Sequence, residues 1–398
     1  MIHLPSLKNI PLLTGKRVFV RVDFNVSLVN GFQITDDTRI VAALPTIQYL
    51  REQGAKVLLL SHLGRPKDEH DTSLSLRKIL PKVEEHLGSV QFVEKFWERE
   101  QLKHAVSTLE NGQVALLENT RFHQGEKSND LTLAKLLAEF GDYFVMDAFG
   151  SAHRAHVSTV GLAQQLPSYA GFLMEKEVKL LTAAVEDPKR PLLVIIGGAK
   201  TIEKIRVVER LLDVADTIYL GGAVANTFFA TWGVGVGVSR VDYEMIEMAR
   251  SLFWKATRTP TRLILPNDVI VSNSDRTTDP IAISYDKIPG GLGIFDLGPT
   301  ARDEVRKLIS EAQTIIWNGP MGYYEDARFK EGTATVLKCI AEQKDKVTIV
   351  GGGDTLTTID DKELLGNISH VSTGGAAMLE FLEKGTLPAI EVLSNQTK

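Results

Sequence analysis

The sequence lacks several features that would each have placed it in a particular class of protein. Its 398 residues include a single cysteine, Cys339, so no internal disulfide can form, which fits a reducing compartment. No apolar run approaches the roughly 20 residues that a membrane-spanning helix needs. The N-terminus has no basic segment leading into an apolar one, so no signal peptide is evident. We therefore expect a cytoplasmic protein with no membrane partner.

The net charge is small and negative. A formal charge of -5 argues against the broadly basic surface that coats nucleic acid, so we expect no nucleic-acid partner. With 43% apolar and 24% charged residues, the composition is that of an ordinary globular protein. Its length suggests two or three domains.

Two familiar nucleotide-binding signatures are also missing. The P-loop, GxxxxGK[ST], does not occur, which excludes a P-loop kinase. Gly233, Gly235 and Gly237 alternate with valines as in a dinucleotide fingerprint, but they follow a predicted helix and not a strand. A nicotinamide oxidoreductase would need that loop after a strand, with an acidic residue roughly 20 positions further on. We therefore interpret the glycines as a turn.

What is present is organised around one central stretch, 170–191. Apolar residues recur there at helical spacing: Phe172, Val178, Leu181 and Val185. Pro188 and Pro191 end the pattern. Since a run of strands and helices of similar length lies on each side, we predict an N-terminal domain 1–170, a connecting helix 171–187 and a C-terminal domain 188–386.

Both halves alternate short apolar runs with longer helical patterns. Strands are predicted at Val18–Val22, Lys56–Leu60, Gln113–Leu117, Tyr143–Met146, Leu192–Ile196, Thr217–Leu220, Arg262–Leu265, Thr314–Trp317 and Val347–Val350. Helices are predicted at Thr38–Glu52, Leu74–Leu87 with a kink at Pro81, Ser128–Glu139, Ile202–Leu212, Asp242–Lys255, Ala301–Glu311 and Gly374–Leu382. Strands that are apolar on both faces are typical of a parallel sheet covered by helices. The fold class is therefore α/β, with two doubly wound parallel-sheet (Rossmann-like) domains joined by a helix.

Ligands of such sheets bind outside the carboxyl ends of the strands. In the first half, the residues at or near those ends are rich in cations: Arg39, His62, Arg65, Arg121 and Arg154. Guanidinium groups match phosphate and carboxylate oxygens bidentately, so this cluster predicts a small, multiply charged anion. Asp23 and Asn25 would accept hydrogen bonds from substrate hydroxyls or orient an arginine. The histidines, at irregular spacing and with no cysteine to complete a site, do not indicate a structural metal.

In the second half, the strands are followed by the loops Gly197–Lys200, Gly221–Ala223, Pro266–Asp268, Asn318–Pro320 and Gly351–Thr355, and all of these except Pro266–Asp268 contain glycine. Glycine lets the backbone approach a ligand closely, and the next helix presents free N–H groups to phosphate. Lys200 and Lys204 lie four apart, on one helical face. Asp354, at a helix start, could hold magnesium. These loops favour a nucleotide site.

These motifs together resemble one family, the phosphoglycerate kinases, from near the first residue to the last. The motifs that carry the resemblance are RVDFNV (21–26), SHLGRP (61–66), ENTRFHQGE (118–126), DAFGSAHRAH (147–156), GGAK (197–200), WNGP (317–320), GGGDT (351–355) and STGG (372–375). The resemblance implies a monomeric, hinge-bending kinase. It would transfer phosphate between ATP and the carboxylate of 3-phosphoglycerate, giving 1,3-bisphosphoglycerate and ADP, with Mg²⁺ as cofactor.

The resemblance also implies roles for individual residues. The phosphoglycerate site would comprise Asp23, Phe24, Asn25, Arg39, His62, Leu63, Gly64, Arg65, Arg121 and Arg154. The nucleotide site would comprise Lys200, Lys204, Gly222, Ala223, Glu325, Gly352, Gly353, Asp354 and Thr355. Glu325 would hold the ribose and Asp354 the magnesium, while residues 387–398 would return to the first domain.

The chemistry requires no general base, because a carboxylate is already deprotonated at pH 7. Catalysis would instead come from domain closure and charge stabilisation. Arg39 and Lys200, with the amides of Gly374 and Gly375, would flank the transferring group, and the helix near Gly171 would be a hinge element.

Several positions depart from the family pattern without removing a charged group: Ser27, Thr201–Glu203, Ala223, Tyr323–Tyr324 and Ala376. Two other functions stay open at this point. A kinase of a different small carboxylic acid or carbamate would share the glycine loops but need fewer arginines. A non-catalytic anion-binding protein would use the loops of the second half only as turns.

Overall fold

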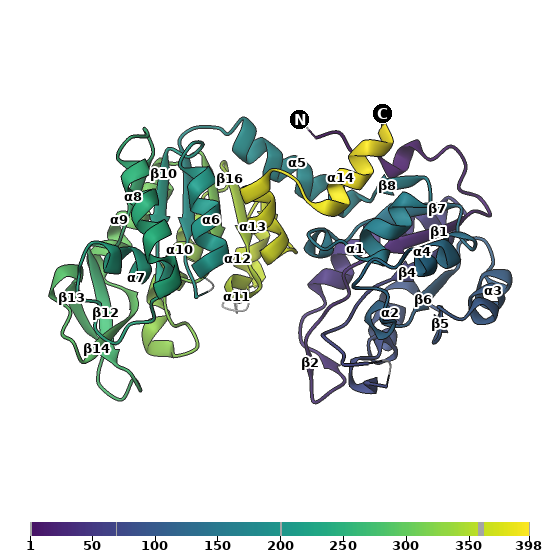
Figure 1. Cartoon of the computed structure of the whole chain (residues 1–398), viewed down its shortest axis with the longest axis horizontal. Helices are drawn as coiled ribbons and strands as arrows, with labels where there is room; N and C mark the ends of the chain where they lie inside the picture. The colour runs from purple at the N-terminus through teal and green to yellow at the C-terminus, as the bar shows by residue number, and fades with distance from the viewer. Residues whose placement is uncertain (1, 69, 200, 357–361, 398) are drawn as a thin grey trace. The chain divides into compact units, whose positions relative to one another are not determined.

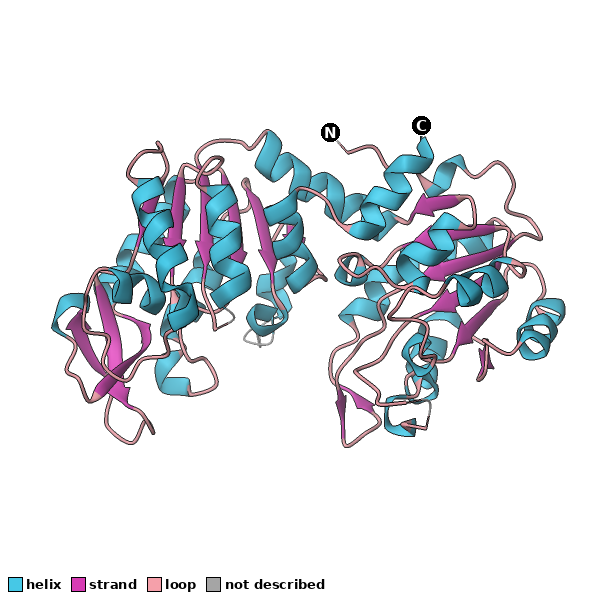
Figure 2. Cartoon of the chain, in the orientation of Figure 1, coloured by secondary structure: helices cyan, strands magenta, loops and turns pink. Residues whose placement is uncertain are grey.

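The computed structural model describes the whole chain except residues 1, 69, 200, 357–361 and 398. The chain divides into two compact units, one formed by Met1–Lys179 with Thr386–Lys398 and the other by Leu180–Gly385. Helix α5 (Phe172–Glu186) carries the chain from the first unit into the second (Figures 1 and 2). No helix among the described residues is both long and apolar enough to cross a membrane.

The first unit is built on a six-stranded sheet in which all neighbours are parallel, in the order β5-β6-β4-β1-β7-β8. Its strands are β1 (Arg17–Arg21), β4 (Lys56–Leu60), β5 (Val90–Val93), β6 (Val114–Leu117), β7 (Tyr143–Met146) and β8 (Ser168–Ala170). In the central strands, Arg21 lies opposite both Leu60 and Met146. The loops after β1, β4 and β7 therefore begin level with one another at one edge of the sheet.

The helices of this unit are α1 (Thr38–Glu52), α2 (Leu80–Leu87), α3 (Arg99–Thr108) and α4 (Leu131–Ala138). The predicted helix Leu74–Leu87 with a kink at Pro81 is confirmed only from Leu80 to Leu87, and there is no kink among these described residues. Two short 3₁₀ turns cover Thr72–Leu74 and Leu76–Lys78, and α2 begins only at Leu80. Pro81 lies in the first turn of α2, where its missing N–H would have had no partner in the helix.

The C-terminal segment also belongs to the first unit. Helix α14 (Pro388–Ser394) buries Ile390 and Leu393, and its Ala389 N–H donates to Ala152 O at 3.1 Å. The Gln396 side-chain oxygen accepts from the Ser168 N–H at 2.7 Å. In Figure 1 this yellow segment lies among elements of the N-terminal half.

The second unit repeats the architecture around a parallel sheet in the order β11-β10-β9-β15-β16-β17. Its strands are β9 (Leu192–Ile196), β10 (Thr217–Leu220), β11 (Arg262–Ile264), β15 (Thr314–Asn318), β16 (Val347–Gly351) and β17 (His370–Val371). The helices are α6 (Thr201–Leu211), α7 (Gly222–Thr231), α8 (Ile246–Ala256), α9 (Pro299–Glu311), α10 (Glu331–Ala341), α11 (Gly353–Leu356), α12 (Lys362–Gly366) and α13 (Gly375–Lys384). Asn318 lies opposite Ile196 and Gly351, so the loops after β9, β15 and β16 start at the same edge.

The second unit also contains a small antiparallel sheet, β13-β12-β14, that the sequence analysis missed. Its strands are β12 (Asp268–Asn273), β13 (Ile281–Ser284) and β14 (Leu292–Leu297). Asp268 does not lie in a ligand-binding loop as predicted. It begins β12, and its carboxylate accepts from the N–H groups of Thr300 and Ala301, at 3.0 and 2.7 Å, at the start of α9.

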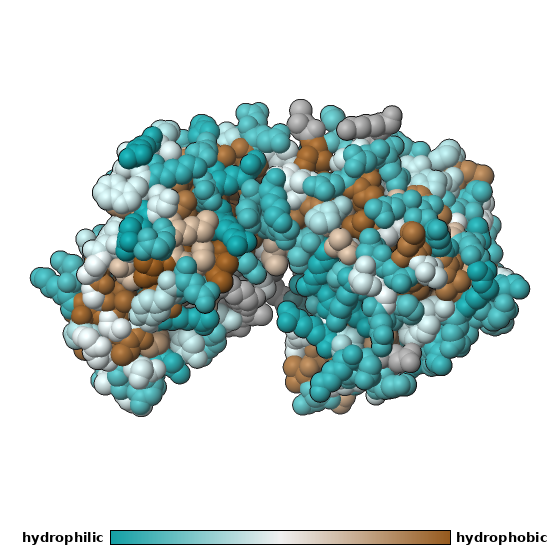
Figure 3. Space-filling view, viewed as in Figure 1, coloured by the Kyte–Doolittle hydropathy of each residue, from teal (hydrophilic) through white to brown (hydrophobic). Residues whose placement is uncertain are grey.

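The surface is mostly hydrophilic, with small separate hydrophobic patches on the visible face (Figure 3). One of these patches lies at the hairpin of β2 (Leu28–Val29) and β3 (Gln33–Ile34), where Val29 and Phe32 are exposed.

Candidate functional site

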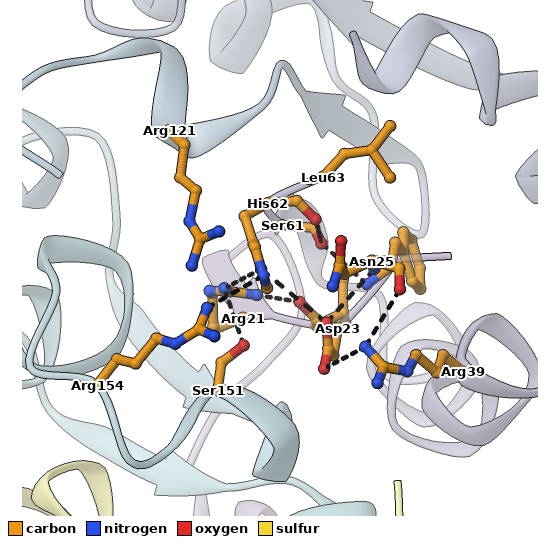
Figure 4. Close-up of polar contacts among 12 residues, drawn as sticks. Arg21, Asp23, Asn25, Arg39, Ser61, His62, Leu63, Arg121, Ser151 and Arg154 are labelled. Carbon is orange, nitrogen blue, oxygen red and sulfur yellow. Dashed lines mark hydrogen bonds and ion pairs between the residues drawn. The ribbon is translucent and has the colours of Figure 1, made fainter. Parts of the chain in front are cut away.

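The cationic residues predicted from strand ends come together in the first unit. Figure 4 shows Arg39, His62, Arg121 and Arg154 around Asp23, on elements that follow four different strands of the sheet. Arg39 lies in the first turn of α1, and the other three lie in the loops after β4, β6 and β7. Because parallel strands end at a common edge, residues far apart in the sequence meet there.

Asp23 orients Arg39. The carboxylate is only 4% exposed, and its Oδ2 accepts from Arg39 Nη1 at 3.1 Å. The same nitrogen donates to Asn25 O at 3.1 Å. These contacts hold one terminal nitrogen of the guanidinium and so fix the direction of the whole planar group. Of the two roles predicted for Asp23, the structure therefore shows the orientation of an arginine.

His62 lies between two arginines and is 3% exposed. Its Nδ1 is 3.0 Å from Arg21 Nη2, and its Nε2 is 3.4 Å from Arg154 Nη1. Burial lowers the pKa of His62 well below its usual value, and the positive charges of neighbouring arginines lower it further. A guanidinium can only donate, and of the two contacts the one from Arg21 to Nδ1 is the shorter, so we assign Nδ1 as the acceptor and place the proton of the neutral imidazole on Nε2. The Nε2–H group and Arg154 are then two donors that face each other, an arrangement that suits an anion bound to both.

This arrangement makes a prediction about protonation. We expect the His62 imidazole to be neutral at pH 6, with its proton on Nε2, although an unperturbed histidine titrates at about 6.5. The unfolded chain would take up a proton below about pH 6.5 that the folded protein does not hold, so His62 should make stability fall as the pH drops below that value. Two-bond ¹H–¹⁵N NMR of the imidazole measures the tautomer directly. Protonated signals at both ring nitrogens at pH 6 would contradict the assignment.

A buried polar layer under the site was missed by the sequence analysis. Arg21, only 1% exposed, donates through Nε to Ser158 Oγ at 2.9 Å and through Nη2 to Ser151 Oγ at 3.3 Å. Ser158 Oγ in turn donates to Glu126 Oε1 at 2.6 Å. Although burial alone would raise the pKa of Glu126, hydrogen bonds from His156 and Ser158 lower it. An arginine inside the apolar run VFVRV was the available signal, because a buried charge requires partners.

Arg121 and Arg154 concentrate positive charge at the same edge. Burial lowers the pKa of Arg121 to about 10, and the nearby charges of Arg154 and Arg21 contribute. Burial also lowers the pKa of Arg154, which the charges of Arg65 and Arg39 lower further. All these groups remain cationic at pH 7. Their mutual repulsion would be relieved by a multiply charged anion.

The remaining predicted residues of this edge hold the loops together. Gly64 N–H donates to Asn25 Oδ1 at 2.8 Å, and Arg121 Nη1 donates to Gly64 O at 2.6 Å. Leu63 N–H donates to Asn119 Oδ1 at 3.2 Å. Phe24 is fully buried. These contacts connect the loops after β1, β4 and β6, while Arg65 is exposed.

In the second unit the glycine loops pack directly against one another. Gly222 and Gly319 have φ angles of +55° and +95°, in the region that favours glycine. A Cβ on Gly222 would lie 2.6 Å from Gly198 N, and one on Gly319 would lie 2.2 Å from Gly197 O. Lys204 is buried, and its Nζ donates to Gly197 O. The loops after β9, β10 and β15 therefore form one close-packed backbone surface, which we call the glycine cradle (Gly197–Gly198, Gly221–Gly222 and Gly319).

The loops after β16 and β17 adjoin the cradle. Thr355 Oγ1 accepts from the Gly319 N–H at 2.8 Å, and a Cβ on Gly375 would lie 2.8 Å from Gly352 Cα. Gly374 is the N-cap of α13. Beside Gly352, Asn318 Nδ2 is buried and has no hydrogen-bond partner among the described residues. An unpartnered buried donor indicates that an acceptor, such as a phosphate oxygen, belongs there.

Of the other residues predicted to bind the nucleotide, one contacts the glycine cradle, two are exposed and two have side chains that lie outside the described residues. Ala223 is in the first turn of α7, and its N–H donates to Gly198 O at 3.1 Å. Glu325 is exposed, on a turn between β15 and α10. Gly353 begins α11 and is also exposed. Lys200 and the side chain of Asp354 lie outside the described residues.

Comparison with known proteins identifies the family. The family model described as phosphoglycerate kinase matches residues 7–385. The phosphoglycerate kinase of Herpetosiphon aurantiacus is 45% identical over 385 residues, which cover 96% of this chain and 97% of that protein. That of Thermosipho africanus is 47% identical over 392 residues, 97% of each chain.

Solved structures agree with this result. The phosphoglycerate kinase of Coxiella burnetii is similar over 100% of both chains, with a TM-score of 0.88 and 40% identity. The enzyme of Pyrococcus horikoshii is similar over 99% of both chains, with a TM-score of 0.85 and 32% identity. With a cationic edge on one parallel sheet, a glycine cradle on the other and these matches over nearly its whole length, this chain belongs to the phosphoglycerate kinase family.

Proposed function

We propose that the protein catalyses reversible phosphoryl transfer between ATP and the carboxylate of 3-phospho-D-glycerate, which gives 1,3-bisphosphoglycerate and ADP. The observation that carries this proposal is the convergence of Arg39, His62, Arg121 and Arg154 on one edge of the first sheet. Three guanidinium groups and a neutral Nε2–H donor match a substrate that carries both a phosphate and a carboxylate.

The nucleotide is assigned to the glycine cradle and the adjoining loops. The backbone there is packed too closely for side chains, and the adjoining Asn318 Nδ2 is a buried donor with no partner in the described part of the chain. The first turn of α13, which begins at Gly375, presents N–H groups that favour anions, while the Gly374 N–H donates to Ser372 Oγ at 3.3 Å. Glu325 would bind the ribose, and Lys200, Lys204 and Thr355 would complete the site.

The chemistry follows from charge. The attacking carboxylate is an anion, and so is the phosphoryl group that it approaches, so the main barrier is repulsion and not deprotonation. Arg39, already oriented by Asp23, and Lys200 would stabilise the charge on the transferring group, with the amides of Gly374 and Gly375. Since the two substrates are assigned to different units, transfer requires the units to approach each other and to exclude water.

A magnesium ion would accompany the nucleotide. Among the described residues, no three His, Cys, Asp or Glu side chains lie together as a metal site. Mg²⁺ is usually held by one or two carboxylates and by the phosphates of the substrate. Asp354 would supply the carboxylate, and the ion would neutralise charge on the phosphate oxygens.

A coupled assay tests the proposal. We expect turnover that depends on both 3-phosphoglycerate and Mg-ATP and that falls when magnesium is chelated. We also propose that the protein acts as a cytoplasmic monomer. Light scattering in solution would measure its assembly state. Turnover with a different small acid, but not with 3-phosphoglycerate, would favour another carboxylate kinase. If calorimetry detected no Mg-ADP binding, the nucleotide assignment would be wrong.

A further inference from the structure

The loop that carries Glu325 rests directly on the small antiparallel sheet. The Tyr323 N–H donates to Phe295 O on β14 at 2.7 Å. Gly322 has no room for a side chain, because a Cβ there would lie 2.3 Å from Oδ1 of the buried Asp296. The loop and β14 are therefore in backbone contact, and the position of one depends on the other.

Arg276 holds the same loop from the other side of Tyr323. Its guanidinium carbon is 4.5 Å from the centre of the Tyr323 ring and 5.8 Å from that of Phe295. The two rings meet edge to face, at 6.3 Å and 75°. A cation over an aromatic face is attracted by the electron-rich surface of the ring. The three side chains thus form a stack that joins the hairpin of β12 and β13 to the loop.

A main-chain contact makes this connection more rigid. Arg276 has a φ angle of +60°, which is uncommon for a residue with a side chain, and its carbonyl accepts from Arg328 Nη2 at 2.7 Å. Arg328 also pairs with Asp326, through Nη2 and Oδ2 at 2.6 Å. The backbone of Arg276 and its side chain therefore both contact the segment 323–328, with Glu325 in its middle.

We propose that Arg276 and Tyr323 form a positioning pair that holds Glu325 in place for the ribose of the nucleotide. This inference rests on the proposed function, since it assumes that Glu325 contacts the nucleotide. Glu325 is exposed on a turn. The position of its side chain therefore depends on how firmly the neighbouring backbone is held. Tyr323 is anchored two residues before Glu325 by its N–H bond to Phe295 O, and Arg276 lies on its ring. Neither residue belongs to the cationic edge or to the glycine cradle.

Kinetics of variants test the pair. We expect Arg276→Ala and Tyr323→Ala each to raise KM for Mg-ATP by about two- to fivefold, the size expected for a partly exposed cation–aromatic contact. KM for 3-phosphoglycerate should stay unchanged, and the melting temperature should fall by no more than about 4 °C, because the lost contact is small. The double variant should be no worse than the more affected single variant, because both remove the same contact. Tyr323→Phe keeps the aromatic ring, so its KM for Mg-ATP should equal that of the wild type.

The matched control is Arg306→Ala, which removes an exposed arginine of α9 that pairs with Asp303 in its own helix. It should leave every parameter as in the wild type. An unchanged KM for Mg-ATP in Arg276→Ala would contradict the proposal that the two residues position Glu325. Fully additive effects in the double variant would contradict it too. So would an equal rise in both KM values together with a larger fall in the melting temperature. If the wild type itself does not use 3-phosphoglycerate, the proposed function is wrong. Mg-ADP calorimetry on the same variants would still test whether Arg276 and Tyr323 affect nucleotide binding.

Discussion

Replacing Arg39 by alanine is expected to lower kcat by about two to three powers of ten, the usual cost of removing a donor that stabilises a transition state. Two physical effects act together. The variant loses a guanidinium that Asp23 and the Asn25 carbonyl have already oriented. It also leaves the Asp23 carboxylate, 4% exposed, without this cation beside an anionic substrate. Steady-state kinetics with both substrates saturating would measure the change.

Two further variants separate these effects. Adding Asp23→Asn to Arg39→Ala removes the unpaired carboxylate, so part of the lost activity should return. Arg99→Ala is the matched control, because Arg99 is exposed and pairs with Glu139 away from the site. A kcat within threefold of the wild type in Arg39→Ala would remove Arg39 from the transition state.

Replacing Gly319 by alanine is expected to raise the Kd for Mg-ADP at least tenfold. The φ angle of +95° at this position costs a residue with a side chain about 1–3 kcal/mol. The new Cβ would also lie 2.2 Å from Gly197 O and 2.3 Å from Lys204 Nζ. Both contacts are too close, so the loops after β9 and β15 must separate and the cradle must widen. Isothermal titration calorimetry with Mg-ADP measures the effect.

The control for this variant is Gly290→Ala, since a Cβ at Gly290 would have no atom within 4 Å. Binding of 3-phosphoglycerate should not change in Gly319→Ala, because the cationic edge belongs to the other unit. A Kd for Mg-ADP within twofold of the wild type, in a protein that is still folded, would show that the nucleotide does not depend on the cradle.

Much of the fold could be predicted because its signals are local. The runs KVLLL and LLVII are apolar on both faces, and each forms a buried strand, β4 and β9. The helix predicted at Leu74–Leu87 was wrong before Leu80, where apolar spacing continues through segments that fold as 3₁₀ turns. The sheet β12–β14 was missed because its strands are partly exposed, and β13 spans only four residues, none of them buried.

Most residues of the candidate site could be predicted because they follow strands in the sequence. Arg121 and Arg154 could be predicted to lie together because each follows a strand of one parallel sheet. The partners of Arg21 could not, since Ser158 is 137 positions away and its hydroxyl has no special sequence context. The same is true of Arg276 and Tyr323, which meet only because the hairpin of β12 and β13 folds against the loop before α10.

The fold class, the two-part organisation and the residue types at the strand ends could all be read from the chain, because each depends on neighbours within a few residues. The tautomer of His62, the direction of Arg39 and the closeness of the glycine cradle could not. They depend on atoms brought within about 3 Å by folding, such as Arg21 Nη2 beside His62 Nδ1 at 3.0 Å. At that range a shift of one ångström makes or breaks a hydrogen bond, and no pattern along the sequence encodes distances so finely.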